Sequence, residues 1–273
     1  MKIERIKGAT LIADCEDFDP VATFDCGQCF RWAADETGAY TGVAFGRVAR
    51  VSRVGDSVKI ECSQEEFDIV WRDYFDLGLD YAAIRESFCV DEHMRAATAF
   101  GTGIRILRQE PWEALCSFII SQCNNIPRIK KIVETLCLHF GEPISGTKYC
   151  AFPSAKTIAA LSETDLAPLR AGYRAEYIIG AARAVASGEL DLDALTQCDA
   201  ATAREAVKSL RGVGNKVADC AVLFGLHRLD AFPIDTWVKK ALARWNGTLD
   251  PKVFSPYAGI AQQYIFYYER SGH

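Results

Sequence analysis

The first part of the chain alternates short β-prone runs with breaks rich in glycine and aspartate. The runs between residues 9 and 62 are ATLIA, CFRWA, AYTGVA, RVARVSR and SVKIEC. Alternation of apolar and polar positions is typical of strands that bury one face, and short breaks join such strands as hairpins. The pattern therefore predicts an antiparallel sheet between residue 9 and about residue 62.

From residue 63 onward, apolar positions recur at helical spacing instead. Ser63 and Glu66 form a capping-box signature at the start of EEFDIVWRDYF, and the helical pattern continues through DYAAIRESF, PWEALCSFIIS and RIKKIVETLCLHF. The richest break, GEPISGTKYCAFPS, follows a helix that we expect to end near Phe140. Strands first and helices afterwards predict an α+β fold.

Composition sets the class of protein. A chain of 273 residues with 49% hydrophobic and 25% charged residues predicts a globular protein of one large domain or two to three smaller ones. No apolar run reaches membrane-spanning length, and the first residues turn acidic before a signal-peptide hydrophobic segment forms. We expect an intracellular, soluble monomer without a membrane partner, whether cytoplasmic, nucleoid-associated or nuclear.

The distribution of charge matters more than its sum. A net charge of −5 argues weakly against a nucleic-acid partner, because phosphates are neutralised by lysine and arginine. Positive charge nevertheless gathers in PRIKK, LRAGYR, RGVGNK and VKKALAR, among aromatic residues or glycines. For any one of these clusters a solvated helix face is the better explanation, so charge alone leaves the partner open.

Cysteine usage indicates a reducing compartment. The eleven cysteines are scattered through apolar stretches, as expected for reduced core thiols. Cys26 and Cys29 form a C-x-x-C pair, but we expect an extended segment before it and no helix start after it, which disfavours a redox site. No second pair supports zinc, and no cysteine follows Cys220 to support an iron–sulfur cluster.

The stretch LRGVGNKVADC predicts two helices joined by a tight hairpin. One helix ends near Leu210, Gly212 and Gly214 permit the turn, and the second helix begins near Asn215. Backbone amides at a helix N-terminus suit a phosphate oxygen, and glycines let a nucleic-acid strand approach closely. The alternative is a glycine turn with a structural role only.

Lys216 and Cys220 lie one turn apart on the second helix, which places an amine at the rim of a pocket. An amine attacks only when neutral, and from an ordinary pKa of about 10.4 its deprotonation at pH 7 costs about 4 to 5 kcal/mol unless the surroundings help. Asp235, after Pro233, begins another helix; it is either an N-cap alone or a carboxylate facing Lys216. Lys216 could equally contact a phosphate or solvent.

Together the hairpin, the lysine and the aspartate resemble the helix–hairpin–helix Gly/Pro–Asp superfamily of DNA base-excision glycosylases, and VGNKVADC is similar to its 8-oxoguanine branch. The likeness covers nearly the whole chain and includes CGQCFRW, GIRILRQEPWE, FIIS with NNIPRI, AGYRAEY, PID and PYAGIAQQYIF. It implies a TBP-like antiparallel sheet domain with flanking helices over 1–100, a helical bundle over 101–205 and a helix–hairpin–helix catalytic subdomain over 206–273.

The resemblance also implies a bifunctional enzyme. Lys216 matches the nucleophile that attacks C1′ of a flipped nucleotide, forms a Schiff base and leads to strand cleavage by β-elimination, and Asp235 matches the aspartate that supports the developing positive charge. The partner is then duplex DNA that contains oxidised guanine. Catalysis requires no cofactor, and a structural monovalent or calcium ion is expected on the carbonyls of Lys208, Leu210 and Val213.

The base pocket has its own physical logic. Oxidation at C8 turns guanine N7 from an acceptor into an N–H donor, so a single backbone carbonyl accepts the lesion and repels normal guanine. Gly27 matches the family residue that supplies this carbonyl. Gln262 and Phe266, one helical turn apart, match the residues that read the base edge and stack on the base, with Cys220 on the other face; alone, this stripe would indicate a core.

Other residues match those that handle the gap left by the flipped base. Arg128 and Arg174 match arginines that grip the opposite cytosine, and Tyr173 matches the wedge between bases, which predicts preference for the lesion paired with cytosine. Where the family has three successive asparagines, this chain has Cys123 followed by Asn124 and a second asparagine. A thiol is a poor hydrogen-bonding group, so the substitution, natural or engineered, weakens opposite-base reading.

Contacts to DNA phosphates are expected from Gly212, Gly214 and Trp237. Some relatives carry a phosphate-contacting histidine in place of Trp237, and Lys239 or Lys240 could compensate. Two alternatives stay open. An alkylbase glycosylase of the same superfamily would use water as the nucleophile and would not need Lys216, whereas a non-catalytic helix–hairpin–helix module would need that lysine only as a phosphate contact.

Overall fold

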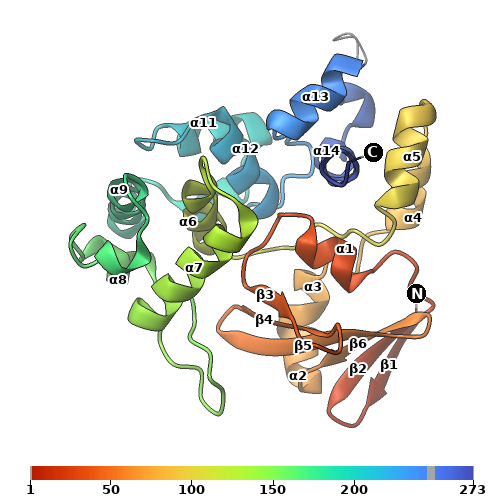
Figure 1. The fold of residues 1–273 in the computed structure, drawn as a ribbon, viewed down its shortest axis with the longest axis horizontal. Helices are drawn as coiled ribbons and strands as arrows, with labels where there is room; N and C mark the ends of the chain where they lie inside the picture. Colours follow the sequence, from red (N-terminus) through yellow and green to blue (C-terminus); the bar gives the residue numbers. More distant parts are fainter. Residues whose placement is uncertain (1, 245–249, 273) are drawn as a thin grey trace.

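The structure is a computed structural model that describes residues 2–244 and 250–272. Six strands form one antiparallel sheet at one end of the molecule (Figure 1) in the order β1-β2-β6-β5-β4-β3. The strands are β1 (Lys2–Ile6), β2 (Ala9–Ala13), β3 (Trp32–Ala34), β4 (Tyr40–Ala44), β5 (Arg47–Val54) and β6 (Ser57–Glu61). The predicted antiparallel sheet is confirmed, and β1 is an additional edge strand. Its sequence KIERI is charged and largely exposed, so it gives little sign of a buried face.

One cluster of aromatic side chains fills the core of the sheet domain. The chain after β6 forms α2 (Gln64–Glu66), a single π-helical turn (Phe67–Trp71) and α3 (Arg72–Tyr74). Trp32 from the sheet donates its Nε1–H to the hydroxyl of Tyr74 at 2.8 Å, and the Trp71 ring stacks on Phe75 with centroids 5.8 Å apart. The capping box at Ser63 is confirmed, with both reciprocal hydrogen bonds present.

The remaining helices form a second, larger core. None of those in the described ranges combines the length and apolar character needed to cross a bilayer. They are α1 (Pro20–Asp25), α4 (Tyr81–Ser87), α5 (Glu92–Phe100), α6 (Pro111–Ser121), α7 (Ile126–Phe140), α8 (Ala155–Ala159), α9 (Arg174–Ser187), α10 (Leu192–Leu195), α11 (Ala200–Lys208), α12 (Asn215–Phe224), α13 (Thr236–Arg244) and α14 (Ala258–Arg270), with 3₁₀ turns at Ala167–Leu169 and Pro251–Phe254.

Most of the sheet core comes from residues up to Leu77 and most of the helical core from Tyr81 onward; Ala22, Cys26 and Phe30 nevertheless pack in the helical core, and Leu107 packs in the sheet core. Helices α4 and α5, which the expected 1–100 domain includes, pack with the helical core: Phe100 of α5 contacts the Tyr267 ring of α14 at a centroid distance of 5.1 Å. The helices on both sides of residue 205 also share this one core. The boundaries of the three expected domains stay a prediction.

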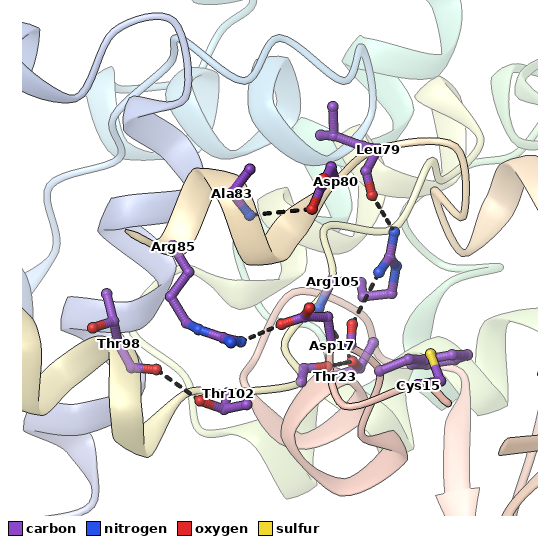
Figure 2. A network of polar contacts seen from close by, with 12 residues as sticks. Cys15, Asp17, Thr23, Leu79, Asp80, Ala83, Arg85, Thr98, Thr102 and Arg105 are labelled. Atoms are coloured by element: carbon purple, nitrogen blue, oxygen red, sulfur yellow. Dashed lines mark hydrogen bonds and ion pairs between the residues drawn. The ribbon is translucent and has the colours of Figure 1, made fainter. Parts of the chain in front are cut away.

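Buried Arg105 joins the sheet domain to the helices. Its guanidinium donates to the carbonyls of Phe75 at 2.8 Å and Asp17 at 2.9 Å and lies 4.2 Å from the centroid of the Tyr81 ring. Figure 2 shows this side chain between Asp17 and Leu79, whose carbonyl it also contacts. Because a buried guanidinium needs its donors satisfied, these bonds hold α1 and the start of α4 in a fixed relation.

Candidate active site

A cavity of about 600 Å³ brings the predicted catalytic and base-pocket residues together. Its walls come from α6, α12, α14, the start of α13 and the loop that follows α1, which lies between the sheet and α14 (Figure 1). The lining residues that the sequence analysis named are Gly27, Asn124, Lys216, Cys220, Asp235, Trp237, Gln262 and Phe266. These positions are far apart in the sequence, so tertiary packing alone assembles the site.

The hairpin between α11 and α12 is present as predicted. Gly212 has a φ of +81°, and a Cβ placed on it would overlap the ring of Tyr177. Gly214 caps α12 and is exposed, and a Cβ there would meet nothing within 4 Å. The fold therefore requires glycine at position 212 but not at position 214, where the missing side chain leaves room for an external partner.

These two glycines give matched variants. We expect Gly212→Ala to lower the free energy of unfolding by about 2 kcal/mol or more, because of its left-handed backbone and the Tyr177 ring. We expect Gly214→Ala to lower this free energy, measured in urea, by about 1 kcal/mol or less, because alanine is a poorer N-cap than glycine, and to bind duplex DNA less tightly in a fluorescence titration. Unchanged DNA affinity in Gly214→Ala would show that no strand approaches the hairpin at this point.

The carbonyls proposed for an ion lie at this hairpin. Lys208 ends α11, and the carbonyl of Leu210 accepts a hydrogen bond from the amide of Val213 at 3.1 Å. A carbonyl has a second lone pair, so this bond does not prevent cation binding. In the two described ranges, no group of three or more His, Cys, Asp or Glu side chains is arranged to hold a metal. An ion here would thus rest on backbone oxygens, and it stays a prediction.

Lys216 lies in the first turn of α12 and is half-buried in the cavity wall. Its Nζ is 3.4 Å from the Ser121 hydroxyl and 5.3 Å from the centroid of the Phe118 ring. Burial raises the pKa of the neighbouring Cys220 thiol to about 11, a rise that the Lys216 charge opposes. The amine therefore stands between a hydroxyl, an aromatic face and a neutral thiol.

Asp235 caps α13, as one of the two interpretations of its position predicted. Its Oδ1 accepts a hydrogen bond from the Val238 amide at 2.8 Å. The side chain also lines the cavity that holds Lys216, and its negative charge contributes to the raised pKa of the Cys220 thiol. One carboxylate thus serves the helix terminus and adds negative charge to the cavity.

The C-x-x-C segment follows a helix and not the predicted extended segment. Asp19 accepts a hydrogen bond from the Ala22 amide, and Pro20 occupies the first helical position of α1. An Asp–Pro pair of this kind is a helix-start signature, and it outweighs the β-prone residues that follow. Cys26 and Cys29 are buried free thiols, and burial raises the pKa of Cys26 to about 11, which disfavours the reactive thiolate.

Gly27, in this segment, presents its backbone to the cavity. Its φ is +82°, and a Cβ there would lie 3.4 Å from the Phe266 ring and 3.5 Å from Arg270 Nη1. Its carbonyl accepts no hydrogen bond from the residues that the structure describes. A free carbonyl beside an aromatic ring is suited to accept a hydrogen bond from a stacked ligand.

Gln262 and Phe266 lie on α14, one turn apart, and both line the cavity. Gln262 is 4% exposed, and its Oε1 is buried without a hydrogen-bond partner among the described residues. A buried acceptor without a donor costs about 1 to 3 kcal/mol, which a ligand N–H would offset. The cavity therefore offers an acceptor and an aromatic face on one helix.

The residues expected to meet the opposite base gather where the loop before α7 meets the start of α9. Tyr173 is 50% exposed, and the Arg174 guanidinium carbon lies 4.6 Å from its ring centroid. Exposed Arg128 donates to the carbonyl of Arg170 at 3.1 Å. Arg174, in contrast, is 4% exposed and donates to the Gln122 carbonyl at 2.9 Å, so in this structure it braces the loop.

Cys123 and Asn124 lie in that loop. Cys123 is exposed with a φ of +47°, a left-handed conformation that asparagine adopts more readily than most residues. Asn124 lines the cavity and donates to the carbonyl of Ile120 at 3.1 Å. In α13, Lys240 Nζ lies 4.4 Å from the centroid of the Trp237 ring, so a cation accompanies this aromatic residue of the cavity wall.

Several polar residues in or beside the cavity were missed from the sequence. Ser121 and Arg270 line it, and Gln263 and Gln109 donate to carbonyls of the loop around Gly27. Helical spacing could have found Arg270, which is one turn beyond Phe266. Gln109 gave no local signal, because its contact joins segments that are 81 positions apart in the sequence.

Comparison with known proteins agrees with this geometry. Residues 10–115 match the N-terminal domain of 8-oxoguanine DNA glycosylase, and residues 116–253 match the HhH-GPD superfamily of base excision DNA repair proteins. The chain is 33% identical over 253 residues to the N-glycosylase/DNA lyase of Saccharomyces cerevisiae, an alignment that covers 80% of this chain and 65% of the yeast protein. It is 31% identical over 275 residues to N-glycosylase/DNA lyase OGG1 of Arabidopsis thaliana, covering 89% of this chain and 75% of the plant protein.

A solved structure with a similar fold is the Clostridium acetobutylicum 8-oxoguanine glycosylase/lyase in complex with double-stranded DNA that contains cytosine opposite 8-oxoguanine. The TM-score is 0.92 at 38% identity, and the match covers 99% of this chain and 98% of that one. The resemblance inferred from the motifs is thereby confirmed. The chain belongs to the HhH-GPD superfamily of base excision DNA repair proteins and, within it, to the 8-oxoguanine DNA glycosylases.

Proposed function

We propose that this chain is a bifunctional DNA glycosylase and abasic-site lyase that removes 8-oxoguanine from duplex DNA inside the cell, acting as a monomer. The observation that carries the proposal is the single cavity that holds an amine, Lys216, a carboxylate, Asp235, and an unpartnered base-edge acceptor, Gln262. Gln262 would contact an extruded base, and Lys216 and Asp235 would act on its sugar.

The chemistry begins with the neutral amine of Lys216. Its lone pair forms a bond to C1′ as the C1′–N9 bond breaks, and the electron pair of that bond leaves with the base. The Asp235 carboxylate stabilises the positive charge that develops on the sugar. The nitrogen loses a proton, and the departing base anion gains one. The C1′–O4′ bond then breaks with its electron pair on O4′, which takes up a proton, and an iminium is left at C1′; removal of a C2′ proton forms a C2′–C3′ double bond and expels the 3′ phosphate.

Recognition of the lesion depends on Gly27, Gln262 and Phe266. The N7–H of 8-oxoguanine donates to the Gly27 carbonyl, whereas normal guanine presents a lone pair that the carbonyl repels. Gln262 Oε1 accepts an N–H from the base edge, and Phe266 stacks on the ring. An alkylbase glycosylase, which uses water, would leave the amine in this cavity without a role, and a binding module alone would not need the buried acceptor.

The direct test uses duplexes with 8-oxoguanine opposite each of the four bases. We expect base release and strand cleavage, fastest opposite cytosine, because Arg128 and Tyr173 stand at the surface where the opposite base would lie. We expect Cys123→Asn to increase the preference for cytosine about 3-fold to 10-fold, since it adds an amide that hydrogen-bonds a base. Equal single-turnover rates opposite all four bases in both proteins would contradict this.

The hairpin ion enters as part of DNA binding and not of the reaction. Carbonyls of Lys208, Leu210 and Val213 would hold a monovalent or calcium ion against a phosphate, beside the amides at Gly212 and Gly214. Trp237 and its neighbour Lys240 would contact the strand on the other side of the cavity. Lys216 and Asp235, which act on the DNA in this mechanism, both belong to the chain itself.

A further inference from the structure

The loop around Gly27 is tied down on both sides of that residue. Three of the four carbonyl oxygens of residues 25–28 accept a hydrogen bond from a side chain in another part of the fold. The donors are Arg270 to Asp25, Gln263 Nε2 to Cys26 at 2.7 Å, and Gln109 Nε2 to Gln28 at 2.8 Å. Within the described residues, the carbonyl of Gly27 alone accepts none.

Gln263 anchors the carbonyl of the residue that immediately precedes Gly27. It is 2% exposed, and it holds the peptide that joins Cys26 to Gly27. Rotation of that peptide would turn the Gly27 backbone, which has a φ of +82° and, as glycine, the conformational freedom to follow such a rotation. The hydrogen bond from Gln263 therefore limits where the Gly27 carbonyl can point.

Gln263 also follows Gln262 directly on α14. Successive residues on a helix point about 100° apart, so one side chain reads the cavity while the next reaches the loop. Gln262, Phe266, Gln263 and Arg270 thus lie on one rigid helix that carries both the base-contacting groups and two of the loop anchors. The helix fixes the distance between the base-edge acceptor and the Gly27 carbonyl.

We propose that Gln263 is a specificity-determining positioning residue, which holds the Gly27 carbonyl in the place where it accepts 8-oxoguanine and repels guanine. The proposal rests on the proposed function. A carbonyl that is free to swing away loses its attraction for the lesion N7–H and its repulsion of the guanine N7 lone pair together. Cleavage of an abasic site involves no nucleobase, so it does not depend on the contact between a nucleobase and the Gly27 carbonyl.

The test compares two substrates in the same protein. Gln263→Met keeps the length of the side chain and removes the donor. We expect its single-turnover release of 8-oxoguanine opposite cytosine to fall about 10-fold to 100-fold, with cleavage of a preformed abasic site within about twofold of the wild type. Its binding preference for an 8-oxoguanine duplex over a guanine duplex should shrink as well.

A matched control loses a buried hydrogen bond elsewhere. Thr98 of α5 is 3% exposed and donates to the Met94 carbonyl at 2.8 Å, away from the cavity, so Thr98→Val should keep both activities within about twofold. Gln263→Glu adds a pH readout. The ionised glutamate has no proton to donate to the Cys26 carbonyl, whereas the protonated carboxyl group can donate its O–H to that carbonyl. Its base-release rate relative to the wild type should therefore rise as the pH falls.

The outcomes separate cleanly. Base release that falls while abasic-site cleavage and the melting temperature are kept supports the proposal. Equal base release in Gln263→Met and the wild type overturns it, and so does a parallel loss of both activities, which would make Gln263 a residue of general stability. A wild type that cleaves the abasic site but releases no 8-oxoguanine would overturn the proposed function and, with it, this inference.

Discussion

We expect the Lys216→Gln variant to lose the covalent complex that borohydride should trap between the wild-type protein and a duplex holding 8-oxoguanine opposite cytosine. An amide nitrogen has no basic lone pair to attack C1′ and cannot form the iminium that borohydride reduces. Removal of a covalent nucleophile costs about 10³-fold or more in rate, so base release in the variant should fall to near background. Denaturing gel electrophoresis of the trapped complex measures the first effect, and quantification of free base measures the second.

Lys240→Gln provides the matched control. Lys240 is a second lysine near the cavity, held 4.4 Å from the Trp237 ring centroid, and its loss should weaken DNA binding without removing the trapped complex. A trapped complex that survives in Lys216→Gln would assign the attack to another amine. Base release by the wild type with no trapped complex would assign it to water and make the chain a monofunctional glycosylase.

Local sequence patterns predicted much of the fold. The alternation of apolar and polar residues located β2, β4, β5 and β6, and the glycine-spaced hairpin located the end of α11 and the start of α12. In each case the sequence signal and the structure both depend on neighbouring residues. The edge strand β1 escaped because an exposed strand has no apolar face to show. Helix α1 escaped because its start depends on Asp19 and Pro20, while the residues after them favour strands.

The site was less accessible from sequence, because its parts meet only after folding. Family motifs named Gly27, Lys216 and Phe266, and the structure places all three on one cavity. No pattern could show that the Gly27 carbonyl is left free or that Gln263 holds its neighbour, since both facts depend on contacts between the two ends of the chain. Burial of Arg174 likewise follows from the packing of α9 against the 122–125 loop.

Asp235→Asn should separate the two roles of this carboxylate. Asparagine is about as good an N-cap as aspartate, so the hydrogen bond to the Val238 amide persists and the free energy of unfolding changes by about 1 kcal/mol or less. The negative charge in the cavity disappears, however, and with it the stabilisation of the developing positive charge on the sugar. We expect single-turnover base release to fall about 10²-fold to 10³-fold, the range found when a preorganised electrostatic group is removed.

Asp235→Ala completes the comparison, because it removes the charge and the cap together. Relative to Asp235→Asn it should lose about a further 1 kcal/mol of stability in urea unfolding, with little further loss of rate. If the asparagine variant instead releases 8-oxoguanine at the wild-type rate while the alanine variant is unstable, Asp235 is a helix cap alone. The charge that balances the sugar would then have to come from the DNA phosphates, and a steep dependence of the wild-type rate on salt would accompany that result.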